Sequence, residues 1–547
     1  MTEAADLVLT NARIHPLADT DDRTEGPLEA LAVRDGEIVR TGDDYEIAFL
    51  EGVETDAIDC EGRVVLPGFV DAHTHIENLG RYLVHADLSG ASGSEECVER
   101  LVASADATEG SDRSAPGSRS PSEAHSGGEW IQGFGYDESE WEGDDRAYLT
   151  REHLDRVSDE RLVVALRVDM HAASLNSVAL ERLADDLPEG DVRRSAGGEP
   201  TGVVVEDAAE IVRSRIAPGY DETRELVTAG LEHAASKGVT AVHDMVRHSR
   251  SPRVYRDLEA AGELPIRVRI NYWTDHADSV IEVGLATNSG SDRVRTGAIK
   301  TYTDGSIGAR TAKLFEPYES DGEGETPSPD SGDDGEWVIA PYELRDIVDQ
   351  ADGAGFQVTA HAIGDEAIEE ALSALEATDD PAGSRHRIEH VELATDSQLE
   401  RMADAGIVAS MQPNFHQWAG EGGLYDQRLG RERRKRTNRF RRVLEAGIPL
   451  AFGSDCMPLD PLLGIHHAVN APTEAQRLSV TEAIRAYTRG AAYAGFDEDR
   501  LGTLEVDKRA DLVVLEESPW DHPERIDEID VSMTLVDGEV VFDGRES

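Results

Sequence analysis

Apolar runs of strand length alternate with amphipathic stretches through the middle of the chain. Between most of these runs the apolar positions follow a helical period, as in residues 342–355 and 365–377. Eight successive β–α units predict an α/β fold, the closed parallel (β/α)8 TIM barrel, whose active site lies at the carboxyl ends of its strands. The eight expected strands are residues 64–73, 239–245, 266–273, 297–304, 356–365, 386–393, 407–415 and 448–455.

Both ends of the chain have a different pattern. Short alternating runs, broken by Asp-Gly and Glu-Gly turns, are typical of strands in a small antiparallel domain. They cover residues 6–15, 30–42 and 56–68 near the start, and 510–519 and 533–544 near the end. We therefore expect a composite β-sandwich domain built from residues 1–66 and 496–547, flanking a barrel over residues 67–495.

The gap between the first and second barrel strands is far longer than one helix needs. We interpret about 76–238 as an inserted subdomain with strands of its own at 130–138 and 161–170. Residues 104–128 and 319–335 are rich in Ser, Gly, Pro and Asp, with almost nothing to bury, which is typical of disordered surface insertions.

The charge excludes two classes of partner. The 547 residues carry 53 basic and 111 acidic side chains, a formal charge of −58, which repels nucleic acid and anionic membrane surfaces. No apolar run is long enough to span a bilayer, and the first residues lack the pattern of a secretory signal, so we expect a cytoplasmic protein. Its three cysteines have spacings that suggest neither disulfides nor a thiolate metal site.

Lysine is scarce among the basic residues. Only five of the 53 are lysine, at positions 237, 300, 313, 435 and 508. Acidic residues are spread along the whole chain, and concentrated salt would screen their repulsion. This composition favours a salt-adapted, halophilic source over an ordinary acidic protein.

Six polar residues fall near the carboxyl ends of five of the expected strands. Imidazoles and carboxylates there are the ligands that zinc or a similar divalent ion needs in a hydrolytic site. Each residue alone has an ordinary alternative: a buried histidine, a salt-bridged core lysine or a turn aspartate. Together they predict a metal site formed by His73, His75, Lys300, His361, His390 and Asp455.

Further polar and aromatic residues are weaker candidates. Asp304 and Arg310 could orient Lys300 or a substrate carboxyl, or form a loop ion pair. Trp141 could line a substrate pocket, as could Tyr136, although aromatic residues there are more often core. His171 could contact substrate. His243, Asp244 and His416 are expected to support the site or the structure.

Several motifs make the sequence similar to a known family. The segments LPGFVDAHTH, GAIKTYTDGSIGARTA, VTAHAIGD, RIEHVE, MQPNF, AFGSDCMPLDPLLGI and LGTLEVDKRADLVVL resemble the amidohydrolase superfamily. The most similar branch is amidohydrolase family 3, the YtcJ-like metal-dependent hydrolases. The resemblance covers nearly the whole chain, including the terminal β-sandwich.

The resemblance implies a ligand set and a reaction. His73 and His75 would bind one metal, His361 and His390 a second, and Asp455 would contact the first metal and the attacking water. Lys300 matches a lysine that many members carbamylate into a bridging carboxylate. Whether one or two ions bind, and whether they are zinc, stays open at this stage.

The expected reaction is attack of a metal-bound hydroxide on a carbon–nitrogen bond other than a peptide bond. Asp455 would pass the proton to the leaving nitrogen. The family includes N-substituted formamide deformylases, so such an amide is the first expectation. The alternatives are a deaminase or cyclic-amide hydrolase on the same barrel and, last, an inactive scaffold. The expected partner is a small-molecule substrate, with neither nucleic acid nor membrane; a homodimer stays open.

Overall fold

The chain forms two compact units in a computed structural model that describes residues 4–18, 28–110, 130–141, 147–319 and 334–546. One unit comprises Met1–His75 with Leu231–Ser547, and the other comprises Ile76–Gly230. The first holds the barrel and the β-sandwich, and the second is the inserted subdomain. The exact domain boundaries expected from the sequence stay predictions.

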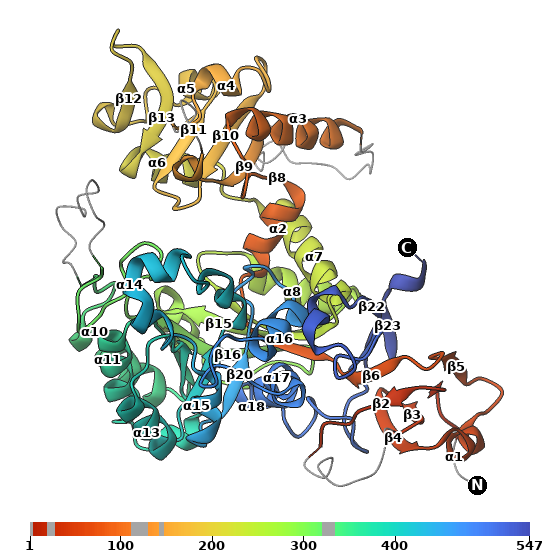
Figure 1. Cartoon of the computed structure of the whole chain (residues 1–547). Coiled ribbons are helices and arrows are strands. Elements are labelled where there is room, and N and C mark those ends of the chain that lie inside the picture. The colour runs from red at the N-terminus through yellow and green to blue at the C-terminus, as the bar shows by residue number, and fades with distance from the viewer. Residues whose placement is uncertain (1–3, 19–27, 111–129, 142–146, 320–333, 547) are drawn as a thin grey trace. The chain divides into compact units, whose positions relative to one another are not determined.

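Eight parallel strands form the central sheet of the first unit (Figure 1). This confirms the predicted TIM-barrel class. The backbone N–H of Asp455, just past the last strand, donates to the carbonyl of His73 at 2.8 Å, so the two ends of the sheet meet. In sheet order from the first edge the strands are β7 (Phe69–Thr74), β14 (Val239–Val246), β15 (Arg267–Trp273), β16 (Val294–Tyr302), β17 (Val358–Ala362), β18 (Arg387–His390), β19 (Val408–Met411) and β20 (Leu450–Phe452).

The first expected barrel strand, residues 64–73, is two strands in two different sheets. β6 (Val64–Pro67) pairs with a strand of the β-sandwich, and β7 pairs with β14 in the barrel. The change occurs at Gly68, where an added Cβ would lie 2.2 Å from Cγ2 of Thr240. Both strands are fully buried, so one continuous apolar run conceals the change of sheet.

Amphipathic helices cover the barrel strands. In α10 (Pro341–Gly353) the buried positions are Leu344, Val348 and Ala351, spaced so that one face of the helix is apolar. The neighbouring helix α11 (Asp365–Leu375) buries two such rows of apolar residues. The other helices of this unit are α1 (Asp44–Ile47), α8 (Ser251–Ala261), α9 (Ala277–Glu282), α11 (Asp365–Leu375), α12 (Pro381–Ser384), α13 (Asp396–Ala405), α14 (Leu424–Arg434), α15 (Phe440–Glu445), α16 (Pro461–Val469), α17 (Val480–Arg485) and α18 (Ala491–Ala494).

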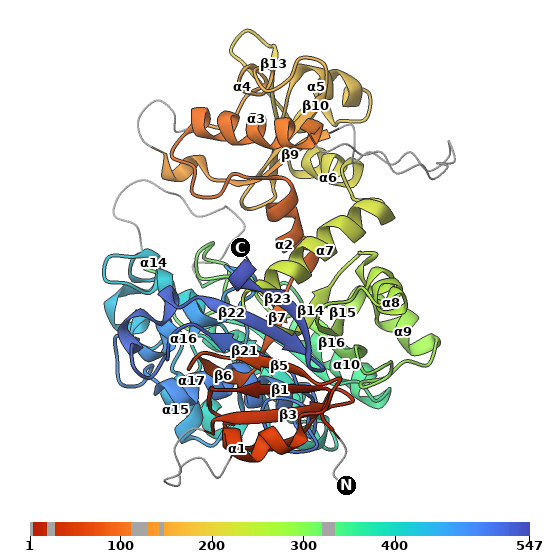
Figure 2. The same cartoon turned by 90° about the vertical axis from the view of Figure 1, so that its right-hand side faces the viewer.

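The β-sandwich comes from both ends of the chain, as predicted. Leu9, Leu31, Val514 and Leu535 belong to the core that joins its two sheets. Figure 2 shows the red N-terminal strands beside the blue C-terminal ones. The first sheet has the order β4 (Glu37–Gly42), β3 (Ala30–Arg34), β1 (Leu7–Thr10), β5 (Asp56–Asp59), and the second β2 (Arg13–Ile14), β6, β21 (Leu512–Leu515), β22 (Val531–Val536), β23 (Glu539–Asp543).

The inserted unit has its own six-stranded sheet, which includes the two strands expected there. In sheet order these are β12 (Val192–Arg194), β13 (Pro200–Val205), β11 (Ala172–Leu175), β10 (Leu162–Arg167), β9 (Trp130–Tyr136) and β8 (Ala86–Asp87). Its helices are α2 (Ile76–Val84), α3 (Ser94–Gly110), α4 (Arg151–Leu154), α5 (Ser177–Leu183) and α6 (Glu206–Arg215), and α7 (Tyr220–Ser236) leads into the first unit.

The two stretches expected to be disordered insertions lie mostly outside the described residues. The first of them begins inside a helix, because 104–110 form the end of α3. Among the residues that the structure describes, no helix combines the length and apolar character needed to cross a bilayer.

Candidate metal centre

Three side chains that could bind a metal meet at the carboxyl end of the barrel. His73 comes from β7, His390 ends β18, and Asp455 follows β20. One potential ligand atom from each lies within 4.8 Å of the other two. Parallel strands bring these carboxyl ends together although the residues are far apart in sequence.

Asp455 also joins the two histidines of the His-x-His pair. Its Oδ1 lies 3.2 Å from Nε2 of His75 and 3.6 Å from Nε2 of His73. Burial raises the pKa of the Asp455 carboxyl, but the nearby His73, His75 and His390 outweigh this and hold it below its usual range. The carboxyl is therefore ionised, as a metal ligand must be.

The backbone is strained at two of these three residues. His390 has a φ of 74° and Asp455 a φ of 56°, in the left-handed region that non-glycine residues rarely occupy. Such conformations cost about 1–3 kcal/mol each and occur preferentially at functional sites.

His361 and Lys300 lie beside this group. The His361 ring packs against His390 with centroids 4.5 Å apart and stacks on Tyr302 at 4.2 Å. Nζ of Lys300 lies 4.8 Å above the Tyr302 ring. Thus all six residues predicted from the sequence belong to one end of the barrel.

The donor atoms present suit a divalent metal. Buried side-chain nitrogens that have no hydrogen-bond partner among the described residues include Nε2 of His73, Nδ1 of His361 and Nδ1 of His390. Burial lowers the pKa of His390 to about 3, so its ring is neutral and offers a lone pair. Uncompensated polar atoms are costly inside a protein, and a bound cation would satisfy them.

Lys300 is buried, and the described residues provide no counter-ion for it. Its side chain is fully buried, and no carboxylate of the described residues lies within ion-pair distance of Nζ. Burial lowers its pKa to about 8, although the charges of Glu389 and Asp455 act in the opposite direction. The salt-bridged core lysine considered as the alternative is thus not found in the described part of the chain.

Two charged residues that support the site were missed in the sequence. Glu389 accepts a hydrogen bond from Nδ1 of His73 at 2.7 Å, which directs Nε2 of His73 toward Asp455. Arg387 pairs with Glu389 at 2.7 Å and donates to Nδ1 of His243 at 2.9 Å. β7 and β14 do not neighbour β18 in the sheet, so these contacts cross the barrel interior.

Asp71 fixes the loops on both sides of the seam between β7 and β20. Its Oδ1 accepts from the backbone N–H groups of His73 at 3.1 Å and Ser454 at 2.9 Å. Gly453 must remain small, because an added Cβ would lie 2.5 Å from the His73 nitrogen. The alternation that places Asp71 and His73 on one face was a readable signal for this residue.

Asp304 organises loops. Its carboxylate accepts hydrogen bonds from the backbone of Ile363, Gly364 and Lys313, and it lies 3.4 Å from Nε2 of His361. Arg310 donates to the carbonyl of Glu319 at 2.8 Å. Neither contact reaches Lys300, and a role for either residue in binding substrate stays a prediction.

Trp141 and His171 belong to the inserted unit. Trp141 is buried in one of its apolar cores, and its indole N–H donates to the carbonyl of Ala91 at 2.7 Å. His171 is exposed and lies 3.3 Å from Glu206. These contacts favour structural roles, and substrate contacts by the two residues stay predictions.

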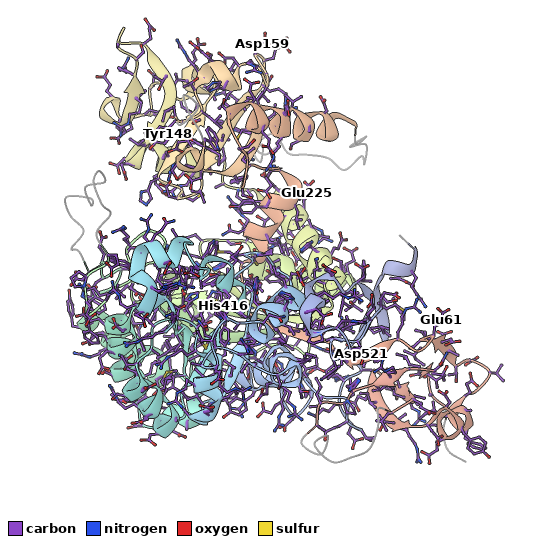
Figure 3. All side chains as sticks on the ribbon, viewed as in Figure 1. Glu61, Tyr148, Asp159, Glu225, His416 and Asp521 are labelled. Atoms are coloured by element: carbon purple, nitrogen blue, oxygen red, sulfur yellow. The ribbon has the colours of Figure 1, made fainter. Side chains whose placement is uncertain are left out.

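The supporting residues differ in their contacts. Asp244 accepts from the Tyr255 hydroxyl at 2.7 Å. His416, labelled in Figure 3, is buried, and burial lowers its pKa to about 3. Its neighbour Phe415 stacks on His390, with ring centroids 5.7 Å apart.

The parallel barrel, the terminal β-sandwich and the histidine–aspartate cluster define a metal-dependent hydrolase of the amidohydrolase superfamily. The model of the amidohydrolase family matches residues 56–542, and the chain belongs to that family. It is 30% identical to the Bacillus subtilis protein YtcJ, named as an amidohydrolase, over 97% of this chain and 98% of that protein.

Two further similarities extend over nearly the whole chain. The N-substituted formamide deformylase of Arthrobacter pascens is 27% identical over 98% of both chains. An uncharacterized metal-dependent hydrolase from Pyrococcus furiosus has a solved structure that superposes with a TM-score of 0.74. It is 30% identical, and the match covers 94% of this chain and 99% of that one.

Proposed function

We propose that this hydrolase cleaves a carbon–nitrogen bond of a small non-peptide amide and that zinc is its metal. The observation that carries the proposal is the convergence of His73, His390 and Asp455 within 4.8 Å. The buried ring nitrogens of the two histidines, which have no other partner among the described residues, support it.

In this proposal some residues bind or orient the metal ligands, and Asp455 transfers the proton. When bound, a divalent ion supplies a Lewis acid and lowers the pKa of water toward neutrality. Asp455 is ionised and lies 3.2 Å from Nε2 of His75. It accepts a proton from the attacking water and passes it to the leaving nitrogen. Glu389 keeps His73 in the orientation and tautomer that a ligand requires.

Lys300 fits the role of a carbamylated lysine in this proposal. Carbamylation requires a neutral amine, and burial lowers the pKa of Lys300 to about 8. The product is an anion, so it would replace an unpaired buried cation with a ligand for the metal. This conversion accounts for a buried lysine with no ion pair in the described part of the chain.

For the substrate we propose an N-substituted formamide. The support is the full-length similarity to a formamide deformylase, at 27% identity. This similarity supports the type of reaction more strongly than the identity of the group attached to nitrogen. A deaminase or cyclic-amide hydrolase would use the same residues on a different carbon.

A substrate panel tests the proposal. Metal-loaded protein is incubated with N-alkyl and N-aryl formamides, acetamides, cyclic amides and amidines, and released amine, formate and ammonia are measured. We expect amine and formate from the formamides, and no turnover after chelation or in the double variant His73→Ala/His75→Ala. Release of ammonia from amidines, or ring opening alone, would replace the first candidate with the second.

A half-buried histidine outside the site provides the control. His15 stacks on Trp520 in the β-sandwich with centroids 4.2 Å apart. The variant His15→Ala should retain metal and turnover. Equal losses in this variant and in the double variant would mean that the losses reflect unfolding and not ligand removal.

A further inference from the structure

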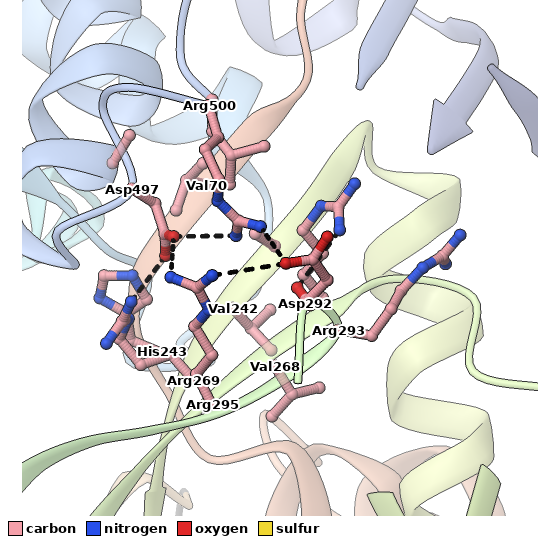
Figure 4. A pocket seen from close by; sticks show the side chains of 14 residues that line it. Val70, Val242, His243, Val268, Arg269, Asp292, Arg293, Arg295, Asp497 and Arg500 are labelled. Atoms are coloured by element: carbon pink, nitrogen blue, oxygen red, sulfur yellow. Dashed lines mark hydrogen bonds and ion pairs between the residues drawn. The ribbon is translucent and has the colours of Figure 1, made fainter. Parts of the chain in front are cut away.

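A cavity lies at the amino end of the barrel strands, opposite the metal centre. It is lined by the first residues of β7, β14, β15 and β16 and by the segment after α18. Figure 4 shows that guanidinium groups and two carboxylates surround it. Its polar lining consists of His243, Arg269, Arg295, Arg500, Asp292 and Asp497, with Arg267 and Arg293 at its border.

Cations outnumber anions around this cavity. Asp497 alone pairs with three guanidiniums, those of Arg269 at 2.7 Å, Arg295 at 3.0 Å and Arg500 at 2.9 Å. Asp292 pairs with Arg295, Arg500 and Arg509. Arg267 and Arg293 are paired with Asp511 and Asp537, so the excess of positive charge belongs to the arginines that share Asp497 and Asp292. The chain as a whole has a net charge of −58, so acidic residues are abundant in it. A cluster in which arginines outnumber carboxylates is therefore unexpected.

Two buried donors around the cavity have no acceptor in the described part of the chain. Nε of Arg269 and Nε of Arg500 are buried without a hydrogen-bond partner among the described residues. Arg269 is only 3% exposed. Leaving such donors without an acceptor is costly, and a hydrogen bond from each to an anion would stabilise the fold.

Arg269 and His243 direct nitrogens to one place. A Cβ added to Gly495 would lie 2.7 Å from Nε2 of His243 and 2.9 Å from Nε of Arg269. Nδ1 of His243 accepts from Arg387, so the proton of the neutral ring is on Nε2. The two nitrogens are therefore both donors, and they lie close to each other on two residues that line the cavity.

We propose that this cavity binds one small monovalent anion the size of chloride. Its volume of about 20 Å³ has room for one or two water-sized groups, which suits a single small ion. The ion would accept from Arg269, Arg500 and His243 and offset the excess of guanidinium charge.

The anion would also order a connection to the metal centre. His243 accepts from Arg387 at 2.9 Å, Arg387 donates to Glu389 at 2.9 Å, and Glu389 contacts His73 at 2.7 Å. By accepting from Nε2 of His243, the anion would hold the ring in the orientation in which Nδ1 accepts from Arg387. The site thus acts on positioning and takes no part in the reaction.

Bromide locates the site directly. Crystals grown without halide are soaked in sodium bromide, and anomalous scattering is measured at the bromine edge. We expect one bromide bounded by Arg269, Arg500 and His243. A cavity holding only water, with bromide confined to the outer surface, would overturn the proposal.

A solution measurement uses matched variants. The thermal midpoint is compared in chloride and in gluconate at equal ionic strength, so that general screening is constant. We expect a higher midpoint in chloride for the wild type and no difference for Arg500→Gln, which leaves both aspartates paired with other arginines. Arg401→Gln removes an arginine that pairs with Glu369 and Glu376 and should keep the chloride effect.

Arg295→Gln is the second variant if Arg500→Gln fails to fold. It too leaves Asp497 and Asp292 with other arginine partners. Identical midpoints in chloride and gluconate for the wild type would contradict the proposal, as would an undiminished chloride effect in both pocket variants.

Discussion

Glu389 and Arg387 place a full ion pair inside the barrel, where neither charge contacts solvent. Glu389 accepts from His73, and burial alone would raise its pKa. Arg387 and His73 outweigh burial and hold that pKa well below its usual range. The carboxylate therefore stays charged and sets the orientation of His73, the proposed metal ligand.

The variant Glu389→Gln tests this positioning role. We expect metal affinity to fall about 10–100-fold, as for other partners that orient metal ligands. Leaving the Arg387 charge without its counter-ion should also cost about 3–5 kcal/mol of stability. Metal competition with a chelator and thermal unfolding measure the two effects separately.

A surface glutamate supplies the control. Glu376→Gln removes a carboxylate that pairs with Arg401 at 2.7 Å on the helical layer. Metal affinity should be unchanged in this variant. An unchanged affinity in Glu389→Gln as well would show that His73 is oriented by the backbone alone.

Lys300 yields a chemical prediction. Lys300→Ala should lose most bound metal and activity, and bicarbonate with a short carboxylic acid should restore part of both. Lys300→Arg should not substitute, because a guanidinium remains cationic and cannot form a carbamate. Metal content and turnover are measured in carbon-dioxide-depleted and supplemented buffer; full activity of the arginine variant would contradict the modification.

Glu392 gives a prediction of pH dependence. It is buried among Tyr425 and Asn438, and burial raises its pKa to about 7. The folded state therefore holds this proton more tightly than the unfolded state, and stability is lost as pH rises toward 7. Glu392→Gln should raise the thermal midpoint at pH 8 relative to wild type and leave it nearly unchanged at pH 5. An equal effect at both pH values would contradict this assignment.

Site residues could be predicted from the sequence only where their position on a predicted strand indicated a role. The six candidate ligands could be found because each falls near a predicted strand end, where a barrel has its active site. The supporting roles of Glu389 and Arg387 could not be predicted. Nothing in the segment RIEH distinguishes a charged side chain that makes contacts across the barrel interior from one that faces solvent. That distinction requires the closure of the sheet.

At the scale of elements, side chains in the loops hold the strand ends in place. Asp304 follows β16, and its carboxylate accepts backbone N–H groups from the loops after β16 and β17. Gly364 in the second loop approaches so closely that an added Cβ would lie 1.9 Å from the Lys313 carbonyl oxygen. The position of His361 depends on this packing.

The variant Asp304→Ala should therefore act on both loops. Three backbone donors would lose their acceptor, at about 1–3 kcal/mol for each that stays buried. We expect a large fall in the thermal midpoint and weaker metal binding. Asp365→Ala, which removes a partly exposed acceptor of the Phe315 N–H, should cost much less; equal costs would contradict a special role for Asp304.

The elements themselves were largely predictable, with one instructive exception. Helices and strands followed the apolar period because each buries one face or both. The run from 64 to 73 gave no sign of its division, since apolar residues suit the sandwich and the barrel equally. Only the contact between Gly68 and Thr240 marks where the chain passes between sheets.

At the scale of the whole molecule the net charge dominates. The formal charge of −58 results from 111 acidic side chains and 53 basic ones, of which only five are lysines. Many of the arginines form ion pairs, such as those around Asp292 and Asp497. The exposed carboxylates that remain repel one another. This self-repulsion favours expansion, and mobile ions reduce it.

Salt should therefore stabilise the fold. The screening length falls from about 10 Å at 0.1 M to about 3 Å at 1 M, below the spacing of many surface charges. We expect the thermal midpoint to rise steeply between these concentrations and to continue rising in multimolar salt. Potassium chloride and potassium gluconate at equal ionic strength should give similar slopes, since screening does not depend on the anion. The chloride-specific increment would then appear as a constant offset that saturates once the barrel cavity is filled. Calorimetry across both salt series measures slope and offset together, and a midpoint independent of salt would contradict the salt-adapted interpretation of the composition.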